Sequence, residues 1–203
     1  MVIAPLLLCH IAIAQDTIRN YYPDNTLQSM GILDENGDKK GTWIFYYPNG
    51  QLNAKEIYKQ NLLEGKVYNY YPDGQLKSVE NWQQDYQTDS AIYYYENGEL
   101  EKAGSYSLGL YDGPWHFYYD TGLLKRSGTF KNGLPVGNWC FYFEDGTLQQ
   151  KGSYEQGKED GYWQFYRKDG TMEYDGYFKN GVRIQPWYYY KKNGKKEKVK
   201  LTE

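Results

Sequence analysis

Two side chains in this sequence could together perform nucleophilic catalysis, His116 and Cys140. A histidine that takes the proton of a neighbouring cysteine produces a reactive thiolate. The two residues are 24 positions apart, which is also the period at which the chain repeats. If each repeat is a pair of antiparallel strands, equivalent residues are about 9–10 Å apart across one intervening strand. That is too far for a hydrogen bond, so we expect no catalytic dyad and no enzyme.

Metal and phosphate sites are equally poorly supported by the residue types. After residue 14 the chain holds one histidine and one cysteine, too few ligands for a typical zinc site. Asp73, Asp145 and Asp169 precede glycines, as in calcium turns, but asparagine or threonine fills this position in other repeats. We interpret the position as a turn residue. The glycines recur at hairpin positions and form no phosphate loop, so no metal and no cofactor are expected.

A 24-residue repeat must position all of these residues. Glycines mark it without insertion or deletion at Gly50, Gly74, Gly98, Gly122, Gly146, Gly170 and Gly194. Residues 18–40 look like a decayed first copy, with Asn25 in place of the glycine. Self-similarity at a fixed period of this length indicates a repeat architecture.

Each repeat predicts two strands joined by tight turns. Trp139, Phe141 and Phe143 alternate with Cys140 and Tyr142, which is the period of a strand. Pro-Asn-Gly or Asp-Gly follows the first strand of a repeat, and Asn-Gly often follows the second. No segment has helical periodicity. We therefore predict an all-β fold, an elongated single-layer antiparallel meander of hairpin repeats with about fifteen strands.

A column of large side chains should hold the sheet together. It comprises Trp43, Val67, Ala91, Trp115, Trp139, Trp163 and Trp187. Gly128, Gly152 and Gly176 fall where the second strand passes the tryptophan of the first, so we predict that a ring lies over each glycine. In the third repeat Asp89 and Ala91 replace glycine and tryptophan, and we predict a looser or more curved segment at 79–92.

Composition favours a thin sheet over a thick aliphatic core. The 203 residues include 25 Tyr and 6 Trp, and the net charge is −3. Tyrosine can pack its ring while its hydroxyl stays in water. Without a basic excess the chain cannot neutralise a phosphate backbone, so nucleic acid is not an expected partner.

The N-terminal segment differs in kind from the repeats. Residues 1–14 are apolar, too few to span a bilayer as a helix, and Ala12-Ile13-Ala14 fits a cleavage site before Gln15. We expect a signal peptide and an exported protein that is periplasmic, outer-membrane-associated or secreted. Without a functional signal, the chain would be cytoplasmic.

The recurring Gly-x-Trp-x-Phe-Tyr-Tyr-x-x-Gly-x-Leu and Gly-x-Tyr-x-x-Gly resemble the MORN repeat (membrane occupation and recognition nexus) in its bacterial variant form. The resemblance covers residues 18–194 and implies hairpin repeats without catalysis of their own. Bacterial members are often labelled antitoxin components, and eukaryotic relatives are associated with scaffolding and phospholipid contact. An export signal does not fit an antitoxin against a cytosolic toxin.

The expected organisation has four parts. Residues 1–14 are the signal peptide, 15–40 a degenerate N-terminal capping repeat, 41–196 the repeat array and 197–203 a basic C-terminal tail. The lysine-rich run at 191–198 has two interpretations. It is an edge strand that lysines protect from pairing, or a contact with an anionic lipid or polymer.

The candidate binding residues are a column of tyrosines on the other face of the strands. They are Tyr46, Tyr70, Tyr94, Tyr118, Tyr142, Tyr166 and Tyr190. The column either packs across strands with wet hydroxyls or forms an extended ladder for a partner. We expect a non-enzymatic scaffold that binds a partner protein through this aromatic surface, in the cell envelope. The alternatives are a module that binds glycan or an anionic membrane surface, and an antitoxin-like neutraliser of a toxin.

Overall fold

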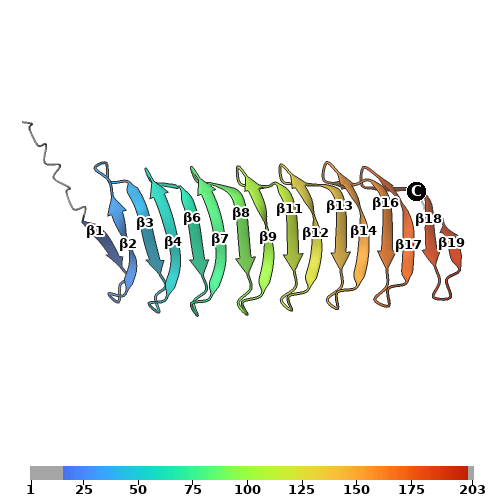
Figure 1. The fold of residues 1–203 in the computed structure, drawn as a ribbon, viewed down its shortest axis with the longest axis horizontal. Helices are drawn as coiled ribbons and strands as arrows, with labels where there is room; N and C mark the ends of the chain where they lie inside the picture. The colour runs from blue at the N-terminus through green and yellow to red at the C-terminus, as the bar shows by residue number, and fades with distance from the viewer. Residues whose placement is uncertain (1–15, 201–203) are drawn as a thin grey trace, which may run out of the picture.

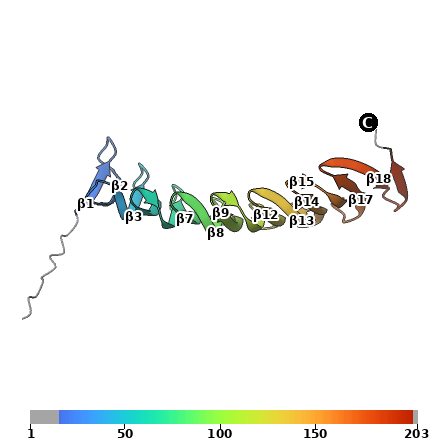
Figure 2. The same cartoon turned by 90° about the horizontal axis from the view of Figure 1, so that it is seen from above.

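The protein is one long, thin, antiparallel sheet. The computed structural model describes residues 16–200, which form a single sheet of 19 strands. The strands follow one another in chain order from one end to the other (Figure 1). Seen from above, the sheet is a single layer that bows along its length (Figure 2). The predicted all-β meander is confirmed, whereas the expected signal peptide lies outside the described residues.

Each full repeat consists of a strand that ends in tyrosine and a strand that begins with leucine or methionine. The former are β3 (Lys39–Tyr46), β6 (Gly65–Tyr70), β8 (Tyr86–Tyr94), β11 (Gly113–Tyr118), β13 (Leu134–Tyr142), β16 (Gly161–Tyr166) and β18 (Val182–Tyr190). The latter are β4 (Leu52–Lys59), β7 (Leu76–Gln83), β9 (Leu100–Ser107), β12 (Leu124–Lys131), β14 (Leu148–Glu155) and β17 (Met172–Lys179).

The two ends of the sheet depart from this plan. At the N-terminal end, β1 (Thr17–Tyr21) pairs with β2 (Leu27–Leu33) within the region expected to cap the array. At the other end, β19 (Lys196–Val199) pairs with β18, so the expected boundary between array and basic tail falls inside a strand. Within the described residues, β19 is the outermost strand at the C-terminal end of the sheet.

Three two-residue strands account for most of the difference between the 19 strands and the expected number of about fifteen. They are β5 (Leu62–Leu63), β10 (Leu110–Tyr111) and β15 (Lys158–Glu159), and each directly precedes a long strand. The long strand begins at Gly65, Gly113 or Gly161, whose φ is positive. At these three glycines φ is 86–112°, whereas the equivalent residues Gly41, Asp89 and Gly137 have φ of 53–66° and lie within undivided strands. The larger departure from strand geometry accompanies the division of one strand into two pieces.

The turn residues behave as the sequence predicts. The side chains of Asn49 and Asp145 accept hydrogen bonds from the backbone N–H groups two residues on, at 3.0 and 2.9 Å. Such bonds fix a tight turn without any ion. Asn25 has a φ of 67°, so it adopts the left-handed conformation expected of the glycine that it replaces.

The core consists of tryptophan rings that lie on bare backbone. All seven positions of the tryptophan column are buried. A Cβ added at Gly152 would lie 2.1 Å from a ring atom of Trp163. In the strand ladder Gly152 faces Trp139, so the ring that covers it belongs to the following repeat. The predicted ring-over-glycine contact is present, and it links each repeat to the next.

In the two repeats without tryptophan, an acidic side chain replaces the glycine over which the ring would lie. Glu56 and Glu80 occupy the glycine positions that precede Val67 and Ala91. Glu80 is buried and accepts hydrogen bonds from Trp82 Nε1 at 3.0 Å and from other side chains. Its network fills the space of the missing ring. The ladder between β7 and β8 continues with one register shift, as it does between β12 and β13, so the expected loosening is not observed. The alternative expectation, a more curved segment, stays a prediction.

The contact between ring and glycine predicts a strong effect of Gly152→Ala. The new methyl group would force Trp163 or the strand to move, and overpacking of this kind costs about 1–3 kcal/mol. We expect a lower urea midpoint, measured by far-UV circular dichroism. Ser153→Ala, on the neighbouring residue, is the control and should change the midpoint little.

A double variant separates this contact from a general loss of strand propensity. Gly152→Ala combined with Trp163→Val adds the methyl group and also removes the ring that it would contact; valine stands at the tryptophan position in the second repeat, at Val67. The double variant should be destabilised by less than the sum of the two single variants. Additive losses of unfolding free energy would contradict a direct contact between the Trp163 ring and Gly152.

Candidate partner-binding surface

The seven predicted tyrosines form one column along the sheet. Each is the last residue of its strand and is half-buried. The first six lie across from leucine or methionine of the next strand, for example Tyr142 from Leu148. Tyr190, the last, lies across from Lys196 instead. The column therefore exists as a continuous row, but it is packed against neighbours rather than fully presented to solvent.

A second set of tyrosines ties the column together. After each of the first four column tyrosines stands a second tyrosine, which donates its hydroxyl to the backbone carbonyl of the column tyrosine in the next repeat. These bonds join Tyr47 to Tyr70, Tyr71 to Tyr94, Tyr95 to Tyr118 and Tyr119 to Tyr142, at 2.7–2.8 Å. Phe143 has no hydroxyl and cannot continue the row. Arg167 resumes it by donating to the carbonyl of Tyr190.

Burial of these hydroxyls changes their ionisation. It raises the pKa of Tyr71, Tyr95 and Tyr119 above the ordinary value of 10.0, and nearby carboxylates raise it further. The neutral hydroxyl is the hydrogen-bond donor, so the folded state favours the form that makes the bond. Packing and hydrogen bonding therefore explain much of the aromatic surface that the sequence offered as a binding ladder.

A different row of side chains is more exposed, and the sequence analysis missed it. One position of the repeat carries Leu62, Tyr86, Leu110, Leu134 and Val182, which are between 38% and 65% exposed. We call these five residues the apolar stripe. Only Lys158 interrupts it in the sixth repeat. The available signal in the sequence was an apolar residue directly after the second turn in five of the repeats.

The apolar stripe lies beside a row of hydrogen-bonded turns. The turns that follow the second strand of each repeat lie at the upper ends of the strands in Figure 1. There Gly133 N–H donates to the carbonyl of Tyr111 at 2.8 Å, and Gly157 N–H donates to that of Pro135 at 3.0 Å. Each turn is thus bonded to the preceding repeat beside a stripe residue, which fixes the spacing of the stripe.

The structure keeps the catalytic candidates apart. His116 pairs with Ser127 in one ladder, and Ser127 pairs with Cys140 in the next, so a whole strand separates the two. Among residues 16–200, no three histidine, cysteine or acidic side chains are grouped to hold a metal ion. No helix of that region could cross a membrane.

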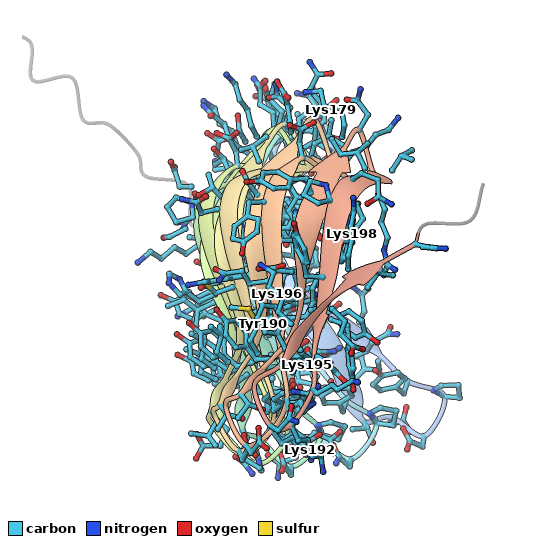
Figure 3. All side chains as sticks on the ribbon, turned by 90° about the vertical axis from the view of Figure 1, so that its right-hand side faces the viewer. Lys179, Tyr190, Lys192, Lys195, Lys196 and Lys198 are labelled. Carbon is cyan, nitrogen blue, oxygen red and sulfur yellow. The ribbon has the colours of Figure 1, made fainter. Side chains whose placement is uncertain are left out.

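The lysines at the C-terminal end do not form one uniform patch. Lys179 lies at one end of the strands and Lys192 at the other (Figure 3). Glu197 forms ion pairs with Lys191 at 2.6 Å and with Lys195 at 3.7 Å. These pairs satisfy part of the charge within the chain. Lysines on the last described strand are consistent with protection of an open edge.

The fold and its surface define a class of protein. Equal hairpins are stacked so that each contacts only its neighbours, which is the architecture of a solenoid-like β-repeat protein. The family model for the MORN repeat variant matches residues 39–60, 63–84, 90–107 and 135–156. The chain belongs to the MORN-repeat proteins and is a repeat scaffold.

Solved structures add little to this assignment. The crystal structure of a GtfA/B complex bound to UDP and GlcNAc is 12% identical, with a TM-score of 0.22 over 75% of this chain and 25% of that chain. The crystal structure of TcdB2-TccC3-Cdc42 is 11% identical, with a TM-score of 0.26 over 89% and 12%. The chain thus spans a quarter or less of these proteins. No curated protein matches it.

The hydroxyl ladder predicts two opposite substitutions. Tyr119→Phe removes the bond to Tyr142 and should lower stability by about 1 kcal/mol. Phe143→Tyr supplies the hydroxyl missing beside Tyr166 and should raise stability by a similar amount. Urea unfolding of both variants and the wild type at neutral pH measures these effects. Equal shifts in the same direction would contradict the ladder.

The raised tyrosine pKa values also predict a loss of stability in alkali. Stability from the neutral hydroxyls is fully present below pH 10 and is lost as pH rises through the folded-state pKa values. Tyr119→Phe should therefore show a smaller fall in its urea midpoint between pH 9 and pH 11 than the wild type. An identical fall in both proteins would contradict the role of this hydroxyl.

Proposed function

We propose that the protein is a non-enzymatic scaffold that binds a partner protein along its apolar stripe, at the cell envelope. The observation that carries the proposal is the exposure of five apolar side chains at one position of the repeat. Exposed apolar side chains that recur in a row, rather than scattered singly, are a common mark of an interaction site.

The geometry of the repeat supports extended recognition. Equivalent residues of consecutive repeats are two strand spacings apart, or about 10 Å. Because each turn is hydrogen-bonded to the preceding repeat beside a stripe residue, the stripe keeps this spacing and need not become ordered on binding. A preorganised surface loses less conformational entropy when a partner binds. An extended partner could contact one stripe residue per repeat.

The tyrosine column has a supporting place in this proposal. Its rings are half-buried and its backbone carbonyls receive the hydroxyl ladder, so its first contribution is to rigidity. The exposed part of each ring stays available to a partner. Contact through Tyr118, Tyr142 and Tyr166 is therefore a second element of the proposal, distinct from contact through the stripe.

The location at the cell envelope rests on the N-terminal segment, which lies outside the described residues. A small-x-small sequence after an apolar run is the pattern of a secretory signal. Mass spectrometry of the mature N-terminus is a direct measurement. A chain that begins at Gln15 in the envelope fraction would support the location, and an intact N-terminus in the cytoplasm would contradict it.

Partner binding should depend on the apolar stripe. A variant with Tyr86→Ser, Leu110→Ser and Leu134→Ser removes three adjacent exposed groups and should reduce capture of the partner at least tenfold. The matched control changes Gln83, Ser107 and Lys131, exposed residues at the ends of the preceding strands, to alanine. Pull-down from envelope extract with quantitative mass spectrometry measures the protein that the wild type captures.

Further variants and ligands in the same experiment distinguish binding through the tyrosine column from binding through the apolar stripe. A variant with Tyr118→Ser, Tyr142→Ser and Tyr166→Ser tests the tyrosine column, with its urea midpoint measured alongside. Undiminished capture by the stripe variant would overturn the proposed role of the stripe. Retention of the wild type on envelope polysaccharide or anionic vesicles, with no protein captured, would favour the glycan- or membrane-binding alternative.

A further inference from the structure

One buried carboxylate of the last repeat lacks part of its hydrogen bonding. Asp175 lies on β17, on the face opposite the tryptophans, and is 4% exposed. Its Oδ2 atom accepts hydrogen bonds from the hydroxyls of Tyr162 at 2.6 Å and Tyr190 at 2.9 Å. Its Oδ1 atom is buried and has no partner. A buried acceptor without a donor is costly, so it calls for an explanation beyond packing.

No other repeat has an acid at this position. The equivalent residues are Met30, Lys55, Val79, Ala103, Ser127 and Lys151. Tyr162 is also particular to this repeat, since its equivalents include Asn138 and Pro114. The repeat fold therefore requires neither side chain. Their combination is a local feature added to the common scaffold.

Aromatic rings surround the carboxylate. Tyr162 and Tyr177 pack with their ring centroids 5.1 Å apart, and both are more than two-fifths exposed. Together with Asp175, Tyr188 and Pro186 they line a hollow of about 260 Å³. A buried carboxylate and phenol rings thus line the same hollow. This combination suits a cation, which is attracted both by the charge and by the ring faces.

The chain already places a cation of its own at this hollow. Lys196 Nζ lies 3.8 Å from the centre of the Tyr188 ring, 5.2 Å from that of Tyr190 and 3.7 Å from Asp175 Oδ2. In Figure 3 Lys196 and Tyr190 lie close together, Tyr190 at the end of β18 and Lys196 at the start of β19. Leucine or methionine stands at this position in the six preceding repeats. Lys196 approaches Oδ2 and leaves Oδ1 without a donor.

We propose that this hollow is a recognition site for the ammonium group of a lysine side chain on a partner, for which Lys196 is the built-in substitute. An incoming ammonium group takes the place of Lys196 over Tyr188 and donates to Asp175 Oδ1. The side chain of Lys196 is 44% exposed, so it can turn outward into solvent when it is displaced.

The chemistry of the hollow selects an amine over other ligands. A buried carboxylate repels an anion, so phosphate and carboxylate groups are excluded. A neutral polyol could donate to Oδ1, but it would leave the charge of Asp175 uncompensated once Lys196 was displaced. An ammonium group supplies the donor, the charge and the attraction to the rings together. The site is separate from the apolar stripe, and binding can be measured without any partner protein.

The test uses the full chain and a small probe. Nα-acetyl-lysine N-methylamide carries the ammonium group, and the norleucine analogue is its neutral counterpart. Dissociation constants are measured by NMR titration of the wild type and Lys196→Ala. Removing the internal competitor should tighten binding of the amine on the order of tenfold. The norleucine analogue should bind neither protein.

Loss of the carboxylate should abolish this binding. Asp175→Asn in the Lys196→Ala background should weaken amine binding at least tenfold. Glu173→Gln is the matched control, because it removes a carboxylate from the same strand outside the hollow, where it pairs with Arg167. If the asparagine variant does not fold, Asp175→Ser, which copies Ser127 of an earlier repeat, replaces it.

Three outcomes would overturn the proposal. The first is equal binding of the lysine and norleucine probes. The second is binding of methyl glucoside to the Lys196→Ala variant without binding of the amine, which would make the hollow a polyol site. The third is an Lys196→Ala variant that folds but binds no amine. None of these results would bear on the proposed scaffold function, which rests on the apolar stripe.

Discussion

The structure depends on one contact, a tryptophan ring that lies on the bare backbone of the preceding repeat. A single-layer sheet has no second layer against which to bury apolar surface. Glycine at positions such as Gly152 lets the ring of Trp163 approach the strand directly, and the indole N–H donates to the carbonyl of Ser153 at 3.1 Å. Ring, backbone and hydrogen bond thus join consecutive repeats. The side chains that make this contact are buried and cannot bind anything else.

The two acids buried in the sheet show how the same chemical group can serve different purposes. Glu80 occupies the place of a glycine, and both of its oxygens receive hydrogen bonds from neighbouring side chains, which replaces a missing tryptophan. Asp175 lies on the opposite face with one oxygen satisfied and the other without a donor. The hydrogen bonding of Glu80 is satisfied within the fold. That of Asp175 is satisfied only when a further donor binds, which supports the proposed recognition of an ammonium group.

In a repeat protein, structural residues can be distinguished from candidate binding residues by two properties, their recurrence in successive repeats and their exposure. Buried residues that recur, such as Trp139 and Gly152, build the sheet. Exposed residues that recur, such as Leu110 and Leu134, offer the same contact in successive repeats and suit an extended partner. A cluster that occurs in one repeat alone, around Asp175, suits a single anchoring group. One thin scaffold can therefore bind an extended partner along the apolar stripe and a single side chain at the hollow around Asp175.

The sequence alone predicts the period, the strands, the turns and the presence of a ring over the in-strand glycines, because these follow from local propensity and spacing. It also separated His116 from Cys140, since one repeat always places a strand between them. The folded sheet was needed to show which ring covers which glycine, that the tyrosine column is half-buried and that the apolar stripe is exposed. It alone brought Tyr162, Asp175 and Lys196 together from three strands. Register, twist and burial depend on all neighbouring strands at once, and no single stretch of sequence contains them.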